Sequence, residues 1–88
     1  MAWALVWSVD AAVSLSKLEK RDARRIVEKL ELAAKNPQHF LERLVGQDDY
    51  KLRVGQYRIL CTLLHSKNAI FIEAMGHRKK IYKTHSKP

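Results

Sequence analysis

Cysteine is almost absent from this chain of 88 residues, in which Cys61 stands alone. A single cysteine forms no intramolecular disulfide and leaves no ligand set for a structural zinc site, so the sequence fits a reducing compartment such as the cytoplasm. Cys61 lies inside the apolar run 59–64, where a small buried side chain is expected rather than a nucleophile.

Long hydrophobic runs are also missing. No stretch approaches the roughly 18 consecutive apolar residues that a membrane helix needs. The apolar segment 2–7 is short and has no basic residue before it, which argues against a secretory signal. We expect a buried strand there, within one small domain that covers residues 1–88.

Acidic residues are few, because 9 Asp and Glu stand against 17 Lys and Arg, for a net charge of +8. This charge favours an anionic partner, namely a nucleic acid, an acidic protein or a membrane surface. The basic residues do not fall on one long amphipathic helix, which disfavours the membrane surface.

Familiar catalytic and cofactor motifs are absent as well. The chain has no glycine-rich phosphate loop, no HExxH, no cysteine pair and no GxSxG. Its histidines lack the regular spacing of metal ligands; they are His39, His65, His77 and His85. We therefore expect no metal or other cofactor.

A strand pattern stands out in the second half of the chain. Tyr50, Leu52 and Val54 alternate with Lys51 and Arg53, which is the period of a strand with one buried face and one face in water. A second apolar run follows almost at once, so the two runs are expected to form a hairpin.

The turn of this hairpin sets its pairing. Gly55-Gln56 suits a two-residue turn, because glycine readily adopts the positive φ needed there. Such a turn places Arg53 directly opposite Arg58, with Lys51 diagonally beyond on the same face. Like charges opposite each other cost up to about 1 kcal/mol per pair, so folding gives no reason for this cluster, whereas an anionic partner would. Alternatively, both arginines splay into solvent.

Helical spacing dominates the first half of the chain. Asp10 is expected to cap a short helix, and regularly spaced apolar residues predict a longer helix over about 21–34. Asn36-Pro37 should end that helix, with one further turn near Phe40.

The remaining elements complete an α+β fold. We expect a polar crossing over 45–49, in which Asp48-Asp49 have a loop or cap role, a turn over 65–68 and a last strand over 69–75. Glu73, in that strand, is expected to form an ion pair or to orient a catalytic base. The predicted architecture is a largely antiparallel four-stranded sheet with two N-terminal helices on one face and the cationic residues on the other.

The C-terminal segment 76–88 contains no acidic residue. A solvated basic tail is one interpretation of it. Ile81 and Tyr82 favour instead a tail that docks on the domain.

In this order, the strand, two helices, YKLRVGQYRI, an apolar strand and GHRKKIYK resemble the RelE toxins of the RelE/ParE superfamily. The most specific parts are the hairpin, from Lys51 to Arg58, and Gly76-His77-Arg78 followed by Tyr82. The resemblance covers nearly the whole chain and implies a RelE-like toxin of a type II toxin-antitoxin system.

The resemblance also implies an activity. RelE toxins are mRNA interferases, which are ribosome-dependent endoribonucleases that cut mRNA in the decoding site and arrest growth by inhibiting translation; an acidic RelB-like antitoxin holds them inactive. A ribose 2′-hydroxyl attacks the adjacent phosphate without a metal, which leaves a 2′,3′-cyclic phosphate and a free 5′-hydroxyl. A cationic site suits this reaction, because negative charge grows on the phosphoryl oxygens in the transition state.

Site residues follow from the same resemblance. Lys51 takes the place of the general base, and Arg53 and Arg58 take that of the phosphate clamp. Arg78 would assist the leaving group, and Tyr82 would orient the scissile nucleotide by stacking, worth roughly 1–3 kcal/mol. Further RNA contacts are expected from His77, Lys79, Lys80 and Lys83. The two guanidinium groups should favour the neutral amine that a lysine base requires.

Two alternatives stay open. A ParE-like gyrase inhibitor would share the fold without RNA chemistry, and a noncatalytic RNA- or ribosome-binding module would use the cations for affinity alone. The complete cationic set favours the nuclease, whereas Asp49 stands where some relatives have a second lysine. For the antitoxin, the surface around Ile26, Val27 and Leu30 is either a docking groove or part of the core.

Overall fold

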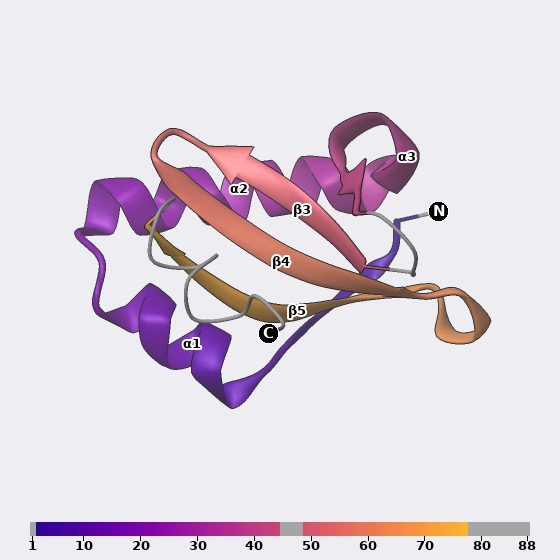
Figure 1. Ribbon diagram of the computed structural model, residues 1–88, viewed down its shortest axis with the longest axis horizontal. Coiled ribbons are helices and arrows are strands. Elements are labelled where there is room, and N and C mark those ends of the chain that lie inside the picture. Colours follow the sequence, from indigo (N-terminus) through magenta and orange to yellow (C-terminus); the bar gives the residue numbers. More distant parts are fainter. Residues whose placement is uncertain (1, 45–48, 78–88) are drawn as a thin grey trace.

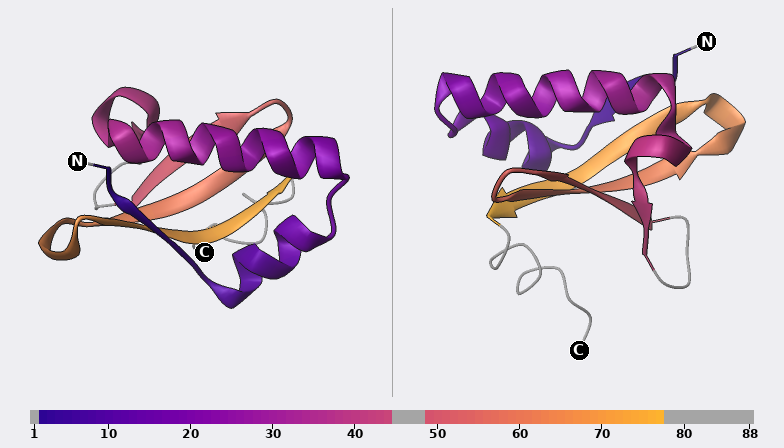
Figure 2. Two further views of the ribbon diagram at one scale, coloured as in Figure 1. Left: turned by 180° about the vertical axis from the view of Figure 1, so that it is seen from behind. Right: turned by 90° about the horizontal axis from the view of Figure 1, so that it is seen from above.

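A computed structural model describes residues 2–44 and 49–77, which form a five-stranded sheet with helices on one face (Figures 1 and 2). The elements in chain order are β1 (Ala4–Trp7), α1 (Val9–Ser16), α2 (Lys20–Lys35), α3 (Pro37–Phe40), β2 (Glu42–Arg43), β3 (Asp49–Val54), β4 (Tyr57–Leu64), the 3-10 helix η1 (His65–Lys67) and β5 (Ala69–His77). The strand order is β1-β5-β4-β3-β2, with β1 parallel to β5 and the other neighbours antiparallel. The predicted α+β class with a largely antiparallel sheet is confirmed.

Strand β1 lies at one end of this strand order. Leu5 and Trp7 pack against the core, but Ala4 and Val6 are exposed. The prediction of a buried strand is therefore wrong for the face that carries Ala4 and Val6. In the described part of the chain, β1 is an edge strand that pairs only with β5.

Helix α1 is capped by Ser8 rather than by Asp10, the predicted cap. The Ser8 hydroxyl oxygen accepts a hydrogen bond from the backbone N–H of Ala11 at 3.0 Å, and it donates to the backbone carbonyl of Glu73 at 2.6 Å. Asp10 lies instead in the first turn, where a carboxylate favours the positive end of the helix. The Ser8 hydroxyl and the Ser8 backbone N–H, which donates to the Ile72 carbonyl at 3.0 Å, thus join the start of α1 to β5. The Glu73 side chain itself is exposed and enters no ion pair with another described residue.

Helix α2 supplies the centre of the core. Ile26 and Leu30 are fully buried, together with Ile59, Ile70 and Ile72 from the sheet. The core interpretation of the α2 apolar face is therefore right for its central residues. Pro37 then starts α3 as its first residue, a position that needs no backbone N–H.

Strand β2 is an additional element that the sequence did not indicate. Its two residues, Glu42 and Arg43, pair with Lys51 and Tyr50 of β3. Two residues are too few to display strand periodicity, which is why the predicted sheet had four strands. The predicted pivot of the crossing, Gly46, lies outside the described residues.

The β3–β4 hairpin has the predicted register. Arg53 pairs with Arg58 and Val54 pairs with Tyr57, while Gly55 has a φ of 60°. The two-residue turn thus fixes which side chains share a face.

Cys61 is fully buried in the middle of β4, as predicted. Burial, with a smaller contribution from the Glu73 carboxylate, raises the pKa of its thiol to about 12. The thiol is therefore protonated at neutral pH. In the described residues, no helix is long and apolar enough to cross a membrane.

Candidate functional site

Lys51, Arg53 and Arg58 lie on the sheet face that the helices leave open, and we call these three residues the cationic face. Leu52 and Val54 alternate with Lys51 and Arg53 along β3 and are buried in the core. Because successive strand residues point to opposite faces, Lys51 and Arg53 point away from the helices, which cover the other face in Figure 2. Arg53 stands directly opposite Arg58.

The three cations differ in exposure. Arg53 is exposed, the Lys51 side chain is 19% exposed, and Arg58 is only 4% exposed. The cross-strand partner of Arg58 on β5 is Gly76, which places no side chain beside Arg58. The interpretation that both arginines splay into solvent is therefore wrong for Arg58. The cationic face combines one embedded guanidinium with one that reaches into solvent.

An acidic residue that the sequence analysis missed faces Lys51. Strand pairing sets Glu42 directly opposite Lys51, and Lys51 Nζ lies 3.6 Å from Glu42 Oε2. The Glu42 side chain is 73% exposed. Only the pairing of β2 with β3 reveals this ion pair, because nine positions separate the two residues in the sequence.

Asp49 is the first residue of β3 rather than part of a loop. Its Oδ1 accepts a hydrogen bond from the Thr62 hydroxyl at 3.1 Å, directly across the β3–β4 pair. Asp49 lies two residues before Lys51 and hence on the same face. Acidic side chains thus stand on both sides of Lys51, one along its strand and one across from it.

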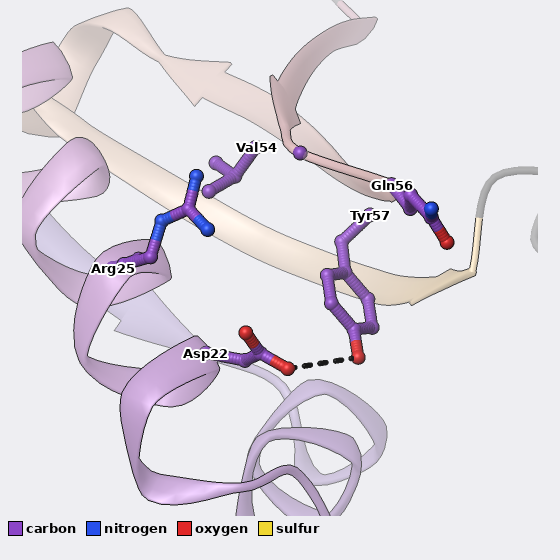
Figure 3. Close-up of a pocket in the computed structure, with 6 residues that line it drawn as sticks. Asp22, Arg25, Val54, Gln56 and Tyr57 are labelled. Atoms are coloured by element: carbon purple, nitrogen blue, oxygen red, sulfur yellow. Dashed lines mark hydrogen bonds between the residues drawn. The ribbon is translucent and has the colours of Figure 1, made fainter.

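A cavity of about 270 Å³ lies on the other side of the hairpin, between α2 and the β3–β4 turn (Figure 3). Its lining residues are Asp22, Arg25, Val54, Gly55, Gln56 and Tyr57. The Tyr57 hydroxyl donates to Asp22 Oδ2 at 3.4 Å. Desolvation and the neighbouring Asp22 carboxylate raise the pKa of Tyr57 above its usual value, which keeps this hydroxyl protonated.

A second hollow, of about 280 Å³, continues from this cavity along the hairpin. The two share Arg25, Val54 and Gly55, and the second is also lined by Lys29 and Arg53. Arg53 therefore belongs both to the cationic face and to a hollow on the α2 side. Across the described ranges, no group of three or more His, Cys, Asp or Glu side chains is arranged to hold a metal ion.

Residues 5–82 match a family model described as the ParE toxin of the type II toxin-antitoxin system parDE. The chain belongs to this toxin family, within the RelE/ParE superfamily. No curated protein matches it significantly.

Solved structures of RelE toxins share the fold of this toxin. A double mutant of E. coli RelE in the free state has a TM-score of 0.81 and 23% identity, over 94% of this chain and 93% of that one. The toxin in the RelBE2 complex from Mycobacterium tuberculosis has a TM-score of 0.79 and 21% identity, over 89% of this chain and 100% of that one. The RelE-RelB complex from Pyrococcus horikoshii OT3 has a TM-score of 0.73 and 22% identity, over 89% of this chain and 97% of that one. The expected RelE-like fold is thereby confirmed.

Among the predicted RNA-contacting residues of the toxin, His77 is the one that lies in the described part. It pairs with Tyr57 across β4 and β5, so it shares the face of Tyr57 and not that of Arg58. Its Nε2 lies 2.9 Å from Gln56 Oε1, and its ring stands edge-on to the Tyr57 ring at 6.3 Å. The other predicted site residues, Arg78, Lys79, Lys80, Tyr82 and Lys83, lie outside the described residues.

Proposed function

We propose that this toxin is a ribosome-dependent endoribonuclease that cleaves mRNA by attack of a ribose 2′-hydroxyl on the adjacent phosphate. The observation that carries the proposal is the pairing of Arg53 with Arg58 on the open sheet face, with Lys51 on the same face. Like charges placed opposite each other weaken a sheet, and a phosphate between them removes that repulsion.

In the proposed reaction, Lys51 in its neutral form accepts the proton of the 2′-hydroxyl. Arg53 and Arg58 stabilise the negative charge that grows on the phosphoryl oxygens, and such preorganised donors contribute most where water is excluded. The bond between phosphorus and the 5′-oxygen breaks, and the leaving oxygen takes a proton from water, which gives a 2′,3′-cyclic phosphate and a 5′-hydroxyl. Arg78 is proposed to assist the leaving oxygen, and Tyr82 to stack on the scissile nucleotide.

Glu42 adds a condition to this mechanism. Its carboxylate oxygen Oε2 lies 3.6 Å from Lys51 Nζ. The carboxylate therefore competes with an incoming phosphate for the same cation. We propose that RNA displaces Glu42 from Lys51, which the exposure of the Glu42 side chain, at 73%, permits without disturbing the core.

The partners follow from the same proposal. The ribosome and mRNA place the toxin in the cytoplasm, and its net charge of +8 suits an acidic RelB-like antitoxin in a hetero-oligomeric complex. Solved structures with this fold include RelE proteins in complex with RelB. Residues 1–88 are proposed to form one toxin domain.

A second candidate is gyrase inhibition without chemistry on RNA. The matching family model is named for ParE toxins, which favours this alternative, whereas the paired arginines beside Lys51 favour the nuclease.

The two functions separate in a parallel assay of the purified toxin. In one arm, translating ribosomes are incubated with the toxin and message 5′ ends are mapped; in the other, DNA gyrase supercoiling is measured. The proposal predicts discrete toxin-dependent cuts in the decoding site and unchanged supercoiling. Intact message together with inhibited supercoiling would establish the gyrase alternative, and arrested ribosomes with intact message would establish a noncatalytic binder.

A further inference from the structure

The cavity between α2 and the β3–β4 turn has no role in the proposed chemistry, yet three kinds of recognition group line it. Arg25 and Asp22 extend into it from neighbouring turns of α2, and the Tyr57 ring forms the opposite side (Figure 3). Gln56 at its rim is oriented by its contact with His77 at 2.9 Å. Gly55 lines the cavity beside Arg25, and a Cβ at Gly55 would stand 3.9 Å from Arg25 Nη2.

These groups keep bonding capacity for a ligand. The hydrogen bond from Tyr57 to Asp22 measures 3.4 Å, which is long for a hydroxyl donor, and a carboxylate offers about four acceptor positions. Arg25 is exposed, and no carboxylate in the described part of the chain forms an ion pair with it.

The charges in the cavity select the chemistry of the ligand. A bare phosphate would meet the Asp22 carboxylate as well as Arg25, so an anion alone fits poorly. A guanine base presents two acceptors, O6 and N7, to a guanidinium, while its N1–H and amino group donate to a carboxylate. The Tyr57 ring adds a stacking surface. A volume of about 270 Å³ lies near the lower end for ligand pockets and suits a base better than an extended ligand.

We propose that this cavity binds a guanine base, with Arg25 reading the O6 and N7 edge, Asp22 accepting from N1–H and the amino group, and Tyr57 stacking. Adenine lacks this match because its N6 amino group is a donor where guanine has an acceptor.

RNA is the favoured source of the base, an assignment that rests on the proposed function. Arg53 lines the hollow that continues from the cavity and belongs to the cationic face. A single strand whose scissile phosphate is held by Arg53 at the cationic face would pass around the exposed hairpin turn, where Lys29 of the second hollow meets the next phosphate.

The test measures binding without ribosomes. Binding of GMP, IMP and AMP, and of short single-stranded RNAs that differ in one G or A, is measured by NMR chemical-shift titration of the full chain. Wild-type toxin should bind GMP at least about 10-fold more tightly than AMP, with IMP between them because it lacks the amino group. Arg25→Ala should weaken GMP binding by about 5- to 100-fold, and Asp22→Asn should erase the advantage of GMP over IMP.

Arg24→Ala is the matched control, because Arg24 is exposed on the same helix and does not line the cavity. The control should change GMP affinity by less than about 2-fold. Equal binding of GMP and AMP, or equal losses from Arg24→Ala and Arg25→Ala, would overturn the proposal.

The same titrations identify the source of the base. A stronger preference for G over A in the RNAs than in the free nucleotides identifies an RNA strand as the source, and an equal preference for G over A identifies a free nucleotide. None of these readouts requires cleavage, so a failure of the nuclease proposal leaves a distinct result.

Discussion

At the scale of single residues, the two arginines of the cationic face differ in a way that separates function from stability. Arg53 is exposed, so Arg53→Ala should change the free energy of unfolding by no more than about 0.5 kcal/mol. Loss of one transition-state donor should nevertheless slow mRNA cleavage by about 100-fold. Urea unfolding and cleavage on programmed ribosomes measure the two effects. Lys67→Ala, an exposed cation in η1 beyond the opposite end of β4, is the control and should leave the cleavage rate unchanged.

Removal of the Glu42 charge should strengthen RNA binding, in contrast to the loss of activity expected from Arg53→Ala. Because its carboxylate competes with phosphate for Lys51, Glu42→Gln should tighten RNA binding by about 2- to 5-fold at low salt, the range of an exposed ion pair. The gain should disappear at high salt, where such interactions are screened. Fluorescence anisotropy with a labelled single-stranded RNA measures both effects. Glu31→Gln removes the same charge from the exposed side of α2; an equal gain from that control would show that only net charge matters.

The buried Cys61 thiol should make the free energy of unfolding depend on pH in the alkaline range. Its pKa is about 12 in the folded protein against 9.0 as the reference value, so the unfolded chain loses this proton first as pH rises. The stability that the protonated thiol contributes is complete below pH 9 and falls progressively from there up to about pH 12. The stability difference between wild type and Cys61→Ala should therefore shift against wild type above pH 9 in urea unfolding. A pH-independent difference would show that the thiol is not desolvated.

At the scale of elements, the hairpin depends on one backbone conformation. Gly55 has a φ of 60°, and a methyl group there would meet Arg25 Nη2 at an ordinary contact distance of 3.9 Å. Gly55→Ala should therefore cost about 1–2 kcal/mol through backbone strain rather than through a clash. Gly55→Asn should cost less, because asparagine tolerates this conformation better. Urea unfolding distinguishes the two variants, and equal costs would contradict the argument.

The hairpin also shows what the sequence can predict. A two-residue turn between two apolar runs leaves little choice of register, so the pairing of Arg53 with Arg58 followed from the residues alone. Strand β2 did not follow, because a pair of residues carries no periodicity. The helix cap was misassigned to Asp10 because Ser8 is selected by its tertiary contact with β5.

The site was predictable only in part for the same reason. Which charged residues lie on one strand face can be read from alternation, whereas their burial depends on the neighbouring strands. The sequence therefore did not reveal that Arg58 is 4% exposed. It also missed the contact of Glu42 with Lys51 and the cavity beside Arg25, since each joins segments that only the folded sheet and α2 bring together.

At the scale of the whole molecule, the sheet separates two tasks. The face covered by α1 and α2 holds the core, and the other face carries the cationic residues. Under the proposed function, a substitution of the exposed Arg53 should change RNA cleavage with little cost in folding, whereas one of the buried Arg58 should affect both. The excess of basic residues, with a net charge of +8, should draw RNA to either side of the hairpin. In the proposed function, cleavage then depends on the three side chains of the cationic face.

The most direct test compares wild type with Lys51→Arg in single-turnover cleavage on programmed ribosomes. Arginine keeps the positive charge but does not lose its proton at accessible pH, so it can contact phosphate without acting as a base. The account predicts that Lys51→Arg binds ribosomes within about 3-fold of wild type and cleaves at least about 100-fold more slowly. Cleavage by Lys51→Arg at the wild-type rate would contradict the role of Lys51 as the base.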